Sequence, residues 1–139
     1  MHMKLIDKSL SDPILKEIGL LLNHAEVFIG QTKYDLEKKE LLLNINRFPV
    51  IKKTVFSKTK HSKEAIKCQV VIRNIEDCII ENIAKELEKI TILFGFHFEK
   101  DRIYFCSAEE NHGKPCYSID CKVSEFDIEI LDKKSFANQ

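Results

Sequence analysis

The alternation of apolar and polar residues at a period of two is the feature that most limits how this sequence can fold. Successive side chains of a strand point to opposite faces, so such runs predict strands with one buried face. Runs of this kind occupy residues 27–34, 41–48, 67–73, 78–83, 91–98, 102–108, 116–123 and 126–131. We therefore expect a mainly β protein, and its 139 residues suit a single domain over 1–139.

One segment near the start follows a helical period instead. Asp12 and Pro13 suit the N-cap and the first position of a helix. Ile14 and Ile18 then recur on one helical face. A helix of about ten residues is marginal alone, so we expect this N-terminal helix to pack against the sheet, which makes the fold class α+β. A shorter helical turn is expected at 84–89.

Two pairs of segments resemble each other, in the same order along the chain. YDLEKKELLL (34–43) is similar to FHFEKDRIYF (96–105), since each has apolar residues around a turn with Glu-Lys at its centre. CQVVIRNIEDCIIE (68–81) is similar to CYSIDCKVSEFDIE (116–129) at a constant offset. A repeated unit of this kind cannot bury its apolar face alone, so its copies are expected to pack or join together.

The matched segments predict an internal duplication over residues 26–83 and 91–131. Each copy would be an antiparallel four-strand meander, and the two copies would form either a sandwich-like arrangement or one extended sheet. The first copy carries a basic insertion arm at 49–66, in which Lys, Ser and Thr predominate.

The strand that contains Phe105 is predicted to pair antiparallel with the strand that contains Ile119. The favoured register places these two residues opposite each other, so that the bulky apolar side chains share one face. It also places Ile103 opposite Cys121, which makes Cys121 a predicted core residue. The other face would carry Tyr104, Cys106, Ser118 and Asp120.

The charges of the chain are segregated, although its 22 basic and 22 acidic residues balance. Residues 47–75 hold 8 Lys or Arg and 1 Asp or Glu, whereas residues 76–139 hold 8 and 14. Such a separation can steer the encounter with a charged partner. An exposed lysine-rich arm would also produce it without any role in binding.

The arm at 49–66 is a candidate for binding nucleic acid or an acidic partner, because lysines contact phosphates. Phe48 and Phe56 lie among the lysines, where aromatic rings can stack on bases or, more simply, anchor the arm to the core. Arginine, the better bidentate ligand of phosphate, is nearly absent there. The candidate binding residues are Lys52, Lys53, Lys58, Lys60 and Lys63.

The five cysteines are an odd number, and no long apolar signal stretch precedes them. Reduced thiols and a cytoplasmic location are therefore expected. No apolar run approaches the roughly 18 residues that a membrane span needs, so we expect no association with a membrane.

Cys106, His112 and Cys116 are the candidate metal ligands or catalytic groups. Their spacing matches no usual zinc pattern, and a core position for Cys121 would remove the fourth ligand. The sequence also has no glycine-rich phosphate loop. We expect no metal, no cofactor and no catalytic residue, which leaves a thiol- or metal-dependent enzyme as a distant alternative.

The last predicted strand carries acidic residues in alternation with apolar ones. Glu125, Asp127 and Glu129 occupy its polar positions, a pattern that is typical of a solvated strand face. Asp77 and Glu81, which match two of them in the earlier segment, are expected to be exposed in the same way.

The segment LLNHAEVFIGQTKYDLEKKELLLNI (21–45) resembles the opening of small bacterial immunity-type proteins from polymorphic toxin systems. In both, a Leu-x-His step precedes a strand, an Asp-containing turn and an apolar strand. The segments IEDCIIE and SEFDIEI resemble the repeated strand endings of those proteins. The chain departs from them at Asn23-His24-Ala25, where a His-Asp step is expected, and in its long insertion.

This resemblance implies a protein that binds and neutralises a cognate toxin and has no catalytic residues. His24 is the position to which it draws attention, although a histidine at a helix end can equally cap carbonyl groups. We therefore expect a non-enzymatic protein-interaction module, in particular a toxin-neutralising immunity protein. The alternative is a protein that binds nucleic acid or an acidic partner through residues 49–66.

Overall fold

The computed structural model describes residues 2–7, 18–19, 21–22, 24–54, 57–82, 90–99, 101–107, 109–111, 114–115 and 117–134. Its strands are β1 (His2–Asp7), β2 (Glu26–Phe28), β3 (Lys33–Asp35), β4 (Glu40–Arg47), β5 (Val50–Thr54), β6 (Ser57–His61), β7 (Ile66–Ile72), β8 (Ile75–Asn82), β9 (Ile90–Glu99), β10 (Arg102–Ser107), β11 (Glu109–Asn111), β12 (Lys114–Pro115), β13 (Tyr117–Val123) and β14 (Phe126–Asp132). A 3-10 helix, η1 (Ile29–Gln31), separates β2 from β3. The predicted mainly β class is confirmed.

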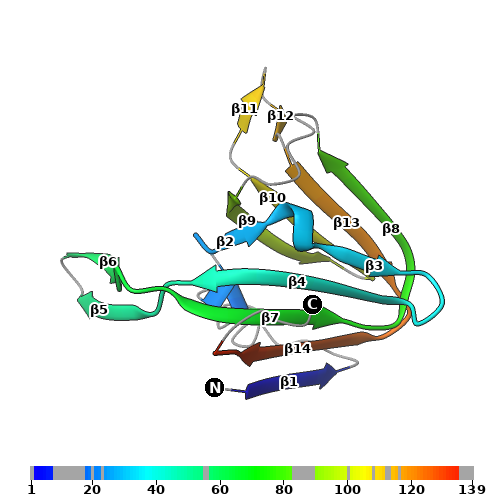
Figure 1. Ribbon diagram of the computed structural model, residues 1–139, viewed down its shortest axis with the longest axis horizontal. Coiled ribbons are helices and arrows are strands. Elements are labelled where there is room, and N and C mark those ends of the chain that lie inside the picture. The colour runs from blue at the N-terminus through cyan, green and yellow to red at the C-terminus, as the bar shows by residue number, and fades with distance from the viewer. Residues whose placement is uncertain are drawn as a thin grey trace.

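The long strands form two antiparallel sheets that share β9 (Figure 1). The first sheet has the order β1-β14-β7-β4-β2-β9, with β3 paired to β4, and the second has the order β9-β10-β13-β8. Residues 90–92 of β9 pair with β2, and the rest of the strand pairs with β10. Two further hairpins, β5-β6 and β11-β12, stand apart from these sheets.

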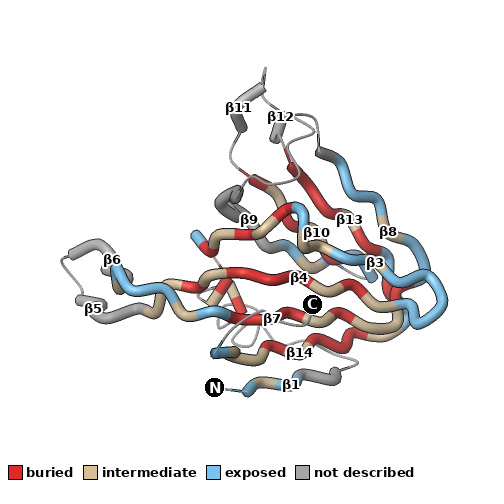
Figure 2. Tube along the Cα trace, in the orientation of Figure 1, coloured by how far each residue is buried: buried red, intermediate tan, exposed pale blue. Residues whose placement is uncertain are grey.

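One core lies between the two sheets, and Figure 2 shows buried positions alternating along the strands on both sides of it. The rings of Phe98 in β9 and Phe126 in β14 meet edge to face, with their centroids 4.9 Å apart. The Tyr117 hydroxyl of the second sheet donates a hydrogen bond of 3.1 Å to Thr32 Oγ1, between η1 and β3. Aliphatic side chains that are fully buried in this core include Leu41, Ile45, Val70, Ile72, Ile103, Ile119, Ile128 and Ile130.

The chain crosses from one sheet to the other at two adjacent corners. Asn74 connects β7 to β8, and Ser124 with Glu125 connects β13 to β14. Ser124 N donates to Asn74 O at 2.9 Å, and Asn74 Nδ2 donates to Glu125 O at 3.4 Å. These bonds keep β7 beside β14 and β8 beside β13, so the two similar segments of the sequence are hydrogen-bonded partners.

The predicted hairpins around DLEKKE and FEKD are both present, as β3-β4 and β9-β10. The register predicted for β10 and β13 is confirmed, since Ile103 lies opposite Cys121 and Phe105 opposite Ile119. Cys121 is fully buried, as predicted. The alternation of burial along β10 follows directly from this register, because its odd-numbered side chains face the core.

The strand order differs from that of two successive meanders. The first sheet draws on β1, β14, β7 and β4, and so combines strands from both halves of the chain. Neither sheet therefore corresponds to residues 26–83 or to 91–131 alone. The duplication itself stays a prediction.

The N-terminal helix is not confirmed. Asp12, Pro13 and Ile14 lie outside the described residues. Ile18, Gly19, Leu21 and Leu22 are α-helical, but no α-helix that spans the predicted segment is among the described elements. Ile18 is buried against the core, but the first element of the fold is strand β1, which pairs with β14. Strand β1 was not predicted. Its pairing partner, β14, lies at the other end of the chain, so no neighbouring segment indicates it. The turn expected at 84–89 also lies outside the described residues.

Candidate functional site

The second sheet has an outer face whose side chains point away from the core. Four strands contribute to it in two neighbouring rows of cross-strand partners. The first row is His97, Tyr104, Asp120 and Ile79, and the second is Glu99, Arg102, Lys122 and Asp77. Here "the outer face" means these eight residues. Cross-strand partners lie about 4.5–5.5 Å apart, so the side chains of each row can act together.

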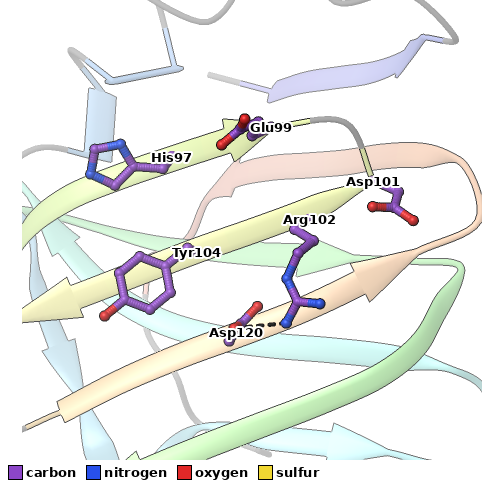
Figure 3. Close-up of a pocket in the computed structure, with 6 residues that line it drawn as sticks. All are labelled: His97, Glu99, Asp101, Arg102, Tyr104 and Asp120. Atoms are coloured by element: carbon purple, nitrogen blue, oxygen red, sulfur yellow. Dashed lines mark ion pairs between the residues drawn. The ribbon is translucent and has the colours of Figure 1, made fainter.

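A hollow of about 460 Å³ opens on the outer face (Figure 3). Arg102 Nη2 and Asp120 Oδ2 form an ion pair of 2.8 Å across it. The rings of His97 and Tyr104 are stacked along one side, with centroids 6.3 Å apart and an interplanar angle of 30°. Its lining consists of His97, Glu99, Asp101, Arg102, Tyr104 and Asp120.

The hollow is anionic, because three carboxylates face one guanidinium. Asp120 engages Arg102 through Oδ2, while its Oδ1 is buried and has no hydrogen-bond partner among the described residues. The hydrogen bond to Asp120 raises the pKa of Arg102, which keeps the guanidinium charged. A buried acceptor without a donor is costly, so Asp120 is only partly compensated by its ion pair with Arg102.

Strand β8 is the last strand of the second sheet, and no strand of the described chain pairs with its second edge. Ile79 and Ile80 on this strand are 48% and 39% exposed. The acidic residues Glu76, Asp77 and Glu81 are exposed on either side of them, and Figure 2 draws most of β8 in the exposed colour. An edge strand with unpaired backbone groups and apolar side chains is suited to receive another extended segment.

The predicted metal or catalytic cluster is described only at Cys106. Cys106 lies on the outer side of β10, opposite Ser118 of β13, as the predicted register required. His112 and Cys116 lie outside the described residues, so the grouping stays a prediction. Among the residues that the structure does describe, no three His, Cys, Asp or Glu side chains are placed to hold a metal ion.

The basic arm is a separate β-hairpin, β5-β6, which projects from the body of the protein (Figure 1). Lys52 and Lys53 lie on β5, Lys58 and Lys60 lie on β6, and Lys63 is exposed just after it. The side chains of the four strand lysines lie outside the described parts of the structure. Their role in binding stays a prediction.

Arg47, which precedes the arm, belongs to the core instead. Its side chain is only 9% exposed and makes two hydrogen bonds to Asp132, Nε to Oδ1 at 2.9 Å and Nη2 to Oδ2 at 2.8 Å. Arg47 was counted with the lysines in the basic segment 47–75. Its partner on β14 lies 85 residues away.

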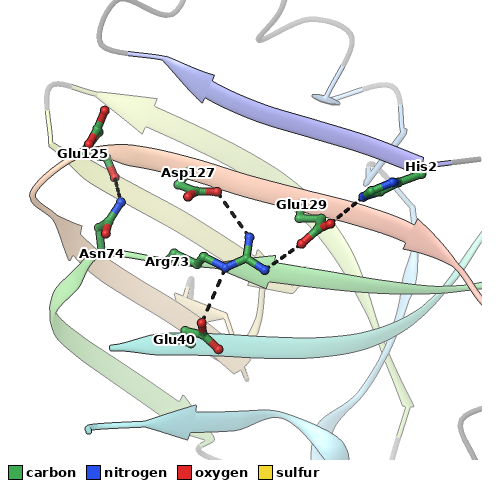
Figure 4. A network of polar contacts seen from close by, with 7 residues as sticks. All are labelled: His2, Glu40, Arg73, Asn74, Glu125, Asp127 and Glu129. Atoms are coloured by element: carbon green, nitrogen blue, oxygen red, sulfur yellow. Dashed lines mark hydrogen bonds and ion pairs between the residues drawn. The ribbon is translucent and has the colours of Figure 1, made fainter. Parts of the chain in front are cut away.

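The prediction that the acidic positions of the last strand form a solvated face is wrong for Asp127, which is buried. Arg73 lies over these positions (Figure 4) and contacts Asp127 at 3.4 Å, Glu129 at 2.6 Å and Glu40 at 3.5 Å. His2 Nε2 reaches the other oxygen of Glu129 at 2.5 Å. The expected exposure of Asp77 and Glu81 is confirmed. Arg73 directly follows β7. It covers the acidic residues of β14 and not those of β8, because β7 lies beside β14 and not beside β8.

Replacing Arg73 by methionine should make unfolding stability less sensitive to acid. The Arg73 hydrogen bond lowers the pKa of Glu129 below its ordinary 4.5. A lowered pKa contributes stability above pH 4.5, and this contribution is lost as the pH falls through the lower value in the folded protein. We expect a cost of about 1 kcal/mol near pH 7 that becomes much smaller near pH 3, measured by urea unfolding. Lys63→Met, at an exposed loop position, is the control, and an equal cost at both pH values would contradict the network.

His24 is exposed, and its backbone has a φ of 63°. Neighbouring Ala25 N donates to Leu22 O at 3.1 Å. His24 does not belong to the outer face or to its hollow. The role of His24 stays a prediction.

Sequence reasoning placed Tyr104 and Asp120 on one face but missed their neighbours His97, Arg102 and Ile79. The signal for His97 was present, since the tight turn between β9 and β10 sets it opposite Tyr104. The exposure of Ile79 could not be predicted in this way. An apolar residue in a strand is expected to be buried unless the strand is known to lie at the edge of a sheet.

Comparison of the chain with protein-family models, with curated proteins and with solved structures finds no match. Within its described residues the structure also contains no helix of the length and apolar character needed to cross a membrane.

Proposed function

We propose that this protein is a non-enzymatic interaction module that binds another protein along β8 and the outer face. The observation that carries the proposal is the pair of exposed isoleucines, Ile79 and Ile80, on an edge strand beside an anionic hollow. Backbone groups of the edge would supply hydrogen bonds, and the isoleucines would be the apolar anchors. The surrounding carboxylates would select the partner by charge.

The partner that fits these features is a protein with an extended segment rich in Lys or Arg. Glu99, Asp101 and Asp120 line the hollow with negative charge, which suits an ammonium or guanidinium group. The stacked rings of His97 and Tyr104 can cover the apolar stem of such a side chain. The resemblance to immunity-type proteins suggests a toxin as this partner, which would make the protein a cytoplasmic neutraliser.

The test is binding to the purified products of the genes that flank this one, measured by calorimetry, together with rescue of growth on co-expression. The double variant Ile79→Lys/Ile80→Lys should weaken binding about 100-fold, the equivalent of roughly 2–3 kcal/mol. Leu36→Lys is the matched control, because Leu36 is 75% exposed but lies in the β3-β4 turn.

Unchanged affinity of the double variant would reject this surface. If no flanking product binds or is neutralised, the toxin-neutralising form of the proposal fails. A partner whose binding depends on Leu36 and not on the isoleucines would place the interface on the β3-β4 turn instead of along β8.

A second candidate function is binding of nucleic acid through the projecting β5-β6 hairpin. The observation that favours this candidate is that the lysine-bearing hairpin projects from the main sheets. Binding of mixed-sequence nucleic acid would then fall steeply with salt, with a slope that decreases when Lys52 and Lys60 are changed to glutamine. No binding at low salt would end this alternative.

A further inference from the structure

Two cysteines of the second sheet lie directly opposite each other. Cys78 on β8 is the cross-strand partner of Cys121 on β13, and both are free thiols. Their sulfur atoms are 3.3 Å apart, and the Cys121 thiol donates a hydrogen bond to Cys78 Sγ. Opposite residues in an antiparallel pair have Cα atoms about 4.5–5.5 Å apart, which lies within the range that disulfides span. The backbone therefore needs no rearrangement for a bond between them.

The two thiols have different surroundings, which gives them different chemical roles. Cys121 is fully buried, whereas Cys78 is partly exposed on the edge strand. The hydrogen bond from Cys121 lowers the pKa of Cys78, and the same contact together with burial raises the pKa of Cys121. The thiolate is the reactive form of cysteine. Of the two thiols, Cys78 is therefore the one expected to react first with an external reagent.

We propose that Cys78 and Cys121 form a redox-active dithiol site that a peroxide oxidises to an intramolecular disulfide. The inference is independent of the proposed binding function, since it depends only on the geometry of β8 and β13. It assigns the nucleophile to Cys78 and the resolving thiol to Cys121.

The reaction balances with one molecule of peroxide. The Cys78 thiolate attacks one peroxide oxygen and breaks the O–O bond, which yields a sulfenic acid and, after protonation of the leaving hydroxide, one water. Cys121 Sγ then attacks the sulfenic sulfur, forms the S–S bond and loses its proton, and the sulfenic hydroxyl leaves as a second water. Two electrons pass from the sulfur atoms to the peroxide.

The other described cysteines lack this arrangement. Cys68 lies in the first sheet, where burial raises the pKa of its thiol to about 12. Cys106 lies on the outer side of β10, away from the core-facing Cys121. Cys106 is therefore a matched control for Cys78. Both are partly exposed, but the residue opposite Cys106 on β13 is Ser118.

The experiment treats the reduced full chain with hydrogen peroxide and follows intact mass and proteolytic peptides without reductant. Wild type and Cys106→Ser should each lose two hydrogens and yield a peptide pair that links 78 to 121. Cys78→Ser should yield no such link. Cys121→Ser, which keeps a hydroxyl donor beside Cys78 but cannot form a disulfide, should stop at the sulfenic acid of Cys78, which dimedone traps.

A wild-type protein in which Cys78 stays a thiol while Cys106 is oxidised would overturn the proposal. A disulfide that joins any other pair of cysteines would overturn it as well. Should Cys121→Ser fail to fold, the wild-type peptide map and the Cys78→Ser variant decide the outcome, because Cys78 lies at the sheet edge and tolerates substitution more readily.

Discussion

Replacing Phe105 by alanine is expected to lower the free energy of unfolding by about 4 kcal/mol. Phe105 is fully buried and lies in the middle of the second sheet, between Phe96 of β9 and Ile119 of β13. Removing the ring loses the free energy gained by transferring it from water into the core. It also leaves a cavity between the two sheets, which cannot close freely around it because β9 joins them. Urea unfolding, with the midpoint interpreted at constant m, measures the change.

The control for this prediction is His97→Ala in the same sheet. His97 is exposed on the outer face, so its removal should cost less than about 0.5 kcal/mol. A cost below about 1 kcal/mol for Phe105→Ala would mean that the two faces of the second sheet are assigned the wrong way round.

Asp132→Ala should lower the free energy of unfolding by about 3 kcal/mol, because it leaves the guanidinium of Arg47 without its carboxylate. The Arg47 side chain is 9% exposed, and both of its hydrogen bonds to Asp132 would be lost. Leaving a charge in a poorly solvated place costs more than the intact pair contributes. The double variant Arg47→Met/Asp132→Leu, which removes both charges, should recover most of the loss.

The same pair should also contribute to acid unfolding. The hydrogen bond from Arg47 lowers the pKa of Asp132 below its ordinary 3.8, so the pair stabilises the fold above that pH and loses its effect as the pH falls through the lower folded value. The difference in stability between wild type and Asp132→Ala should therefore shrink in strong acid. A difference that stays constant with pH, or a double variant no more stable than Asp132→Ala, would contradict the role of the ion pair.

Much of the strand structure could be predicted because it depends on local pattern and on pairs that share a face. The β9-β10 hairpin follows from a short polar turn between two alternating runs, and the register of β10 with β13 follows from keeping Ile103 and Cys121 on the core side. A shift by one residue would have moved every apolar side chain to the outer face.

Other features could not be predicted because they depend on which strands become neighbours. Arg73 covers the carboxylates of Asp127 and Glu129 only because β7 lies beside β14. The same acidic pattern is exposed at Asp77, on an edge strand. Glu81 corresponds to Glu129 in the similar segments, so the local pattern cannot distinguish a covered acidic position from a solvated one.

The candidate site divides in the same way. Tyr104 and Asp120 were placed together by register, whereas the hollow also needs β9 beside β10, since β9 supplies His97 and Glu99. The proximity of Cys78 to Cys121, 43 residues apart in the chain, also had no signal in their spacing.

What the sequence determined alone is which side chains of β10 and β13 face the core, because burying bulky apolar groups fixes the parity of such strands. The tertiary structure decided the order of the strands, and with it which edge stays open and which charges meet. That order depends on how the two sheets pack around one core, which involves all of the strands together and cannot be deduced from any one segment. An open edge at β8, with two isoleucines in water, is the consequence on which the proposed binding depends, and full retention of partner affinity after Ile79→Lys/Ile80→Lys would refute it.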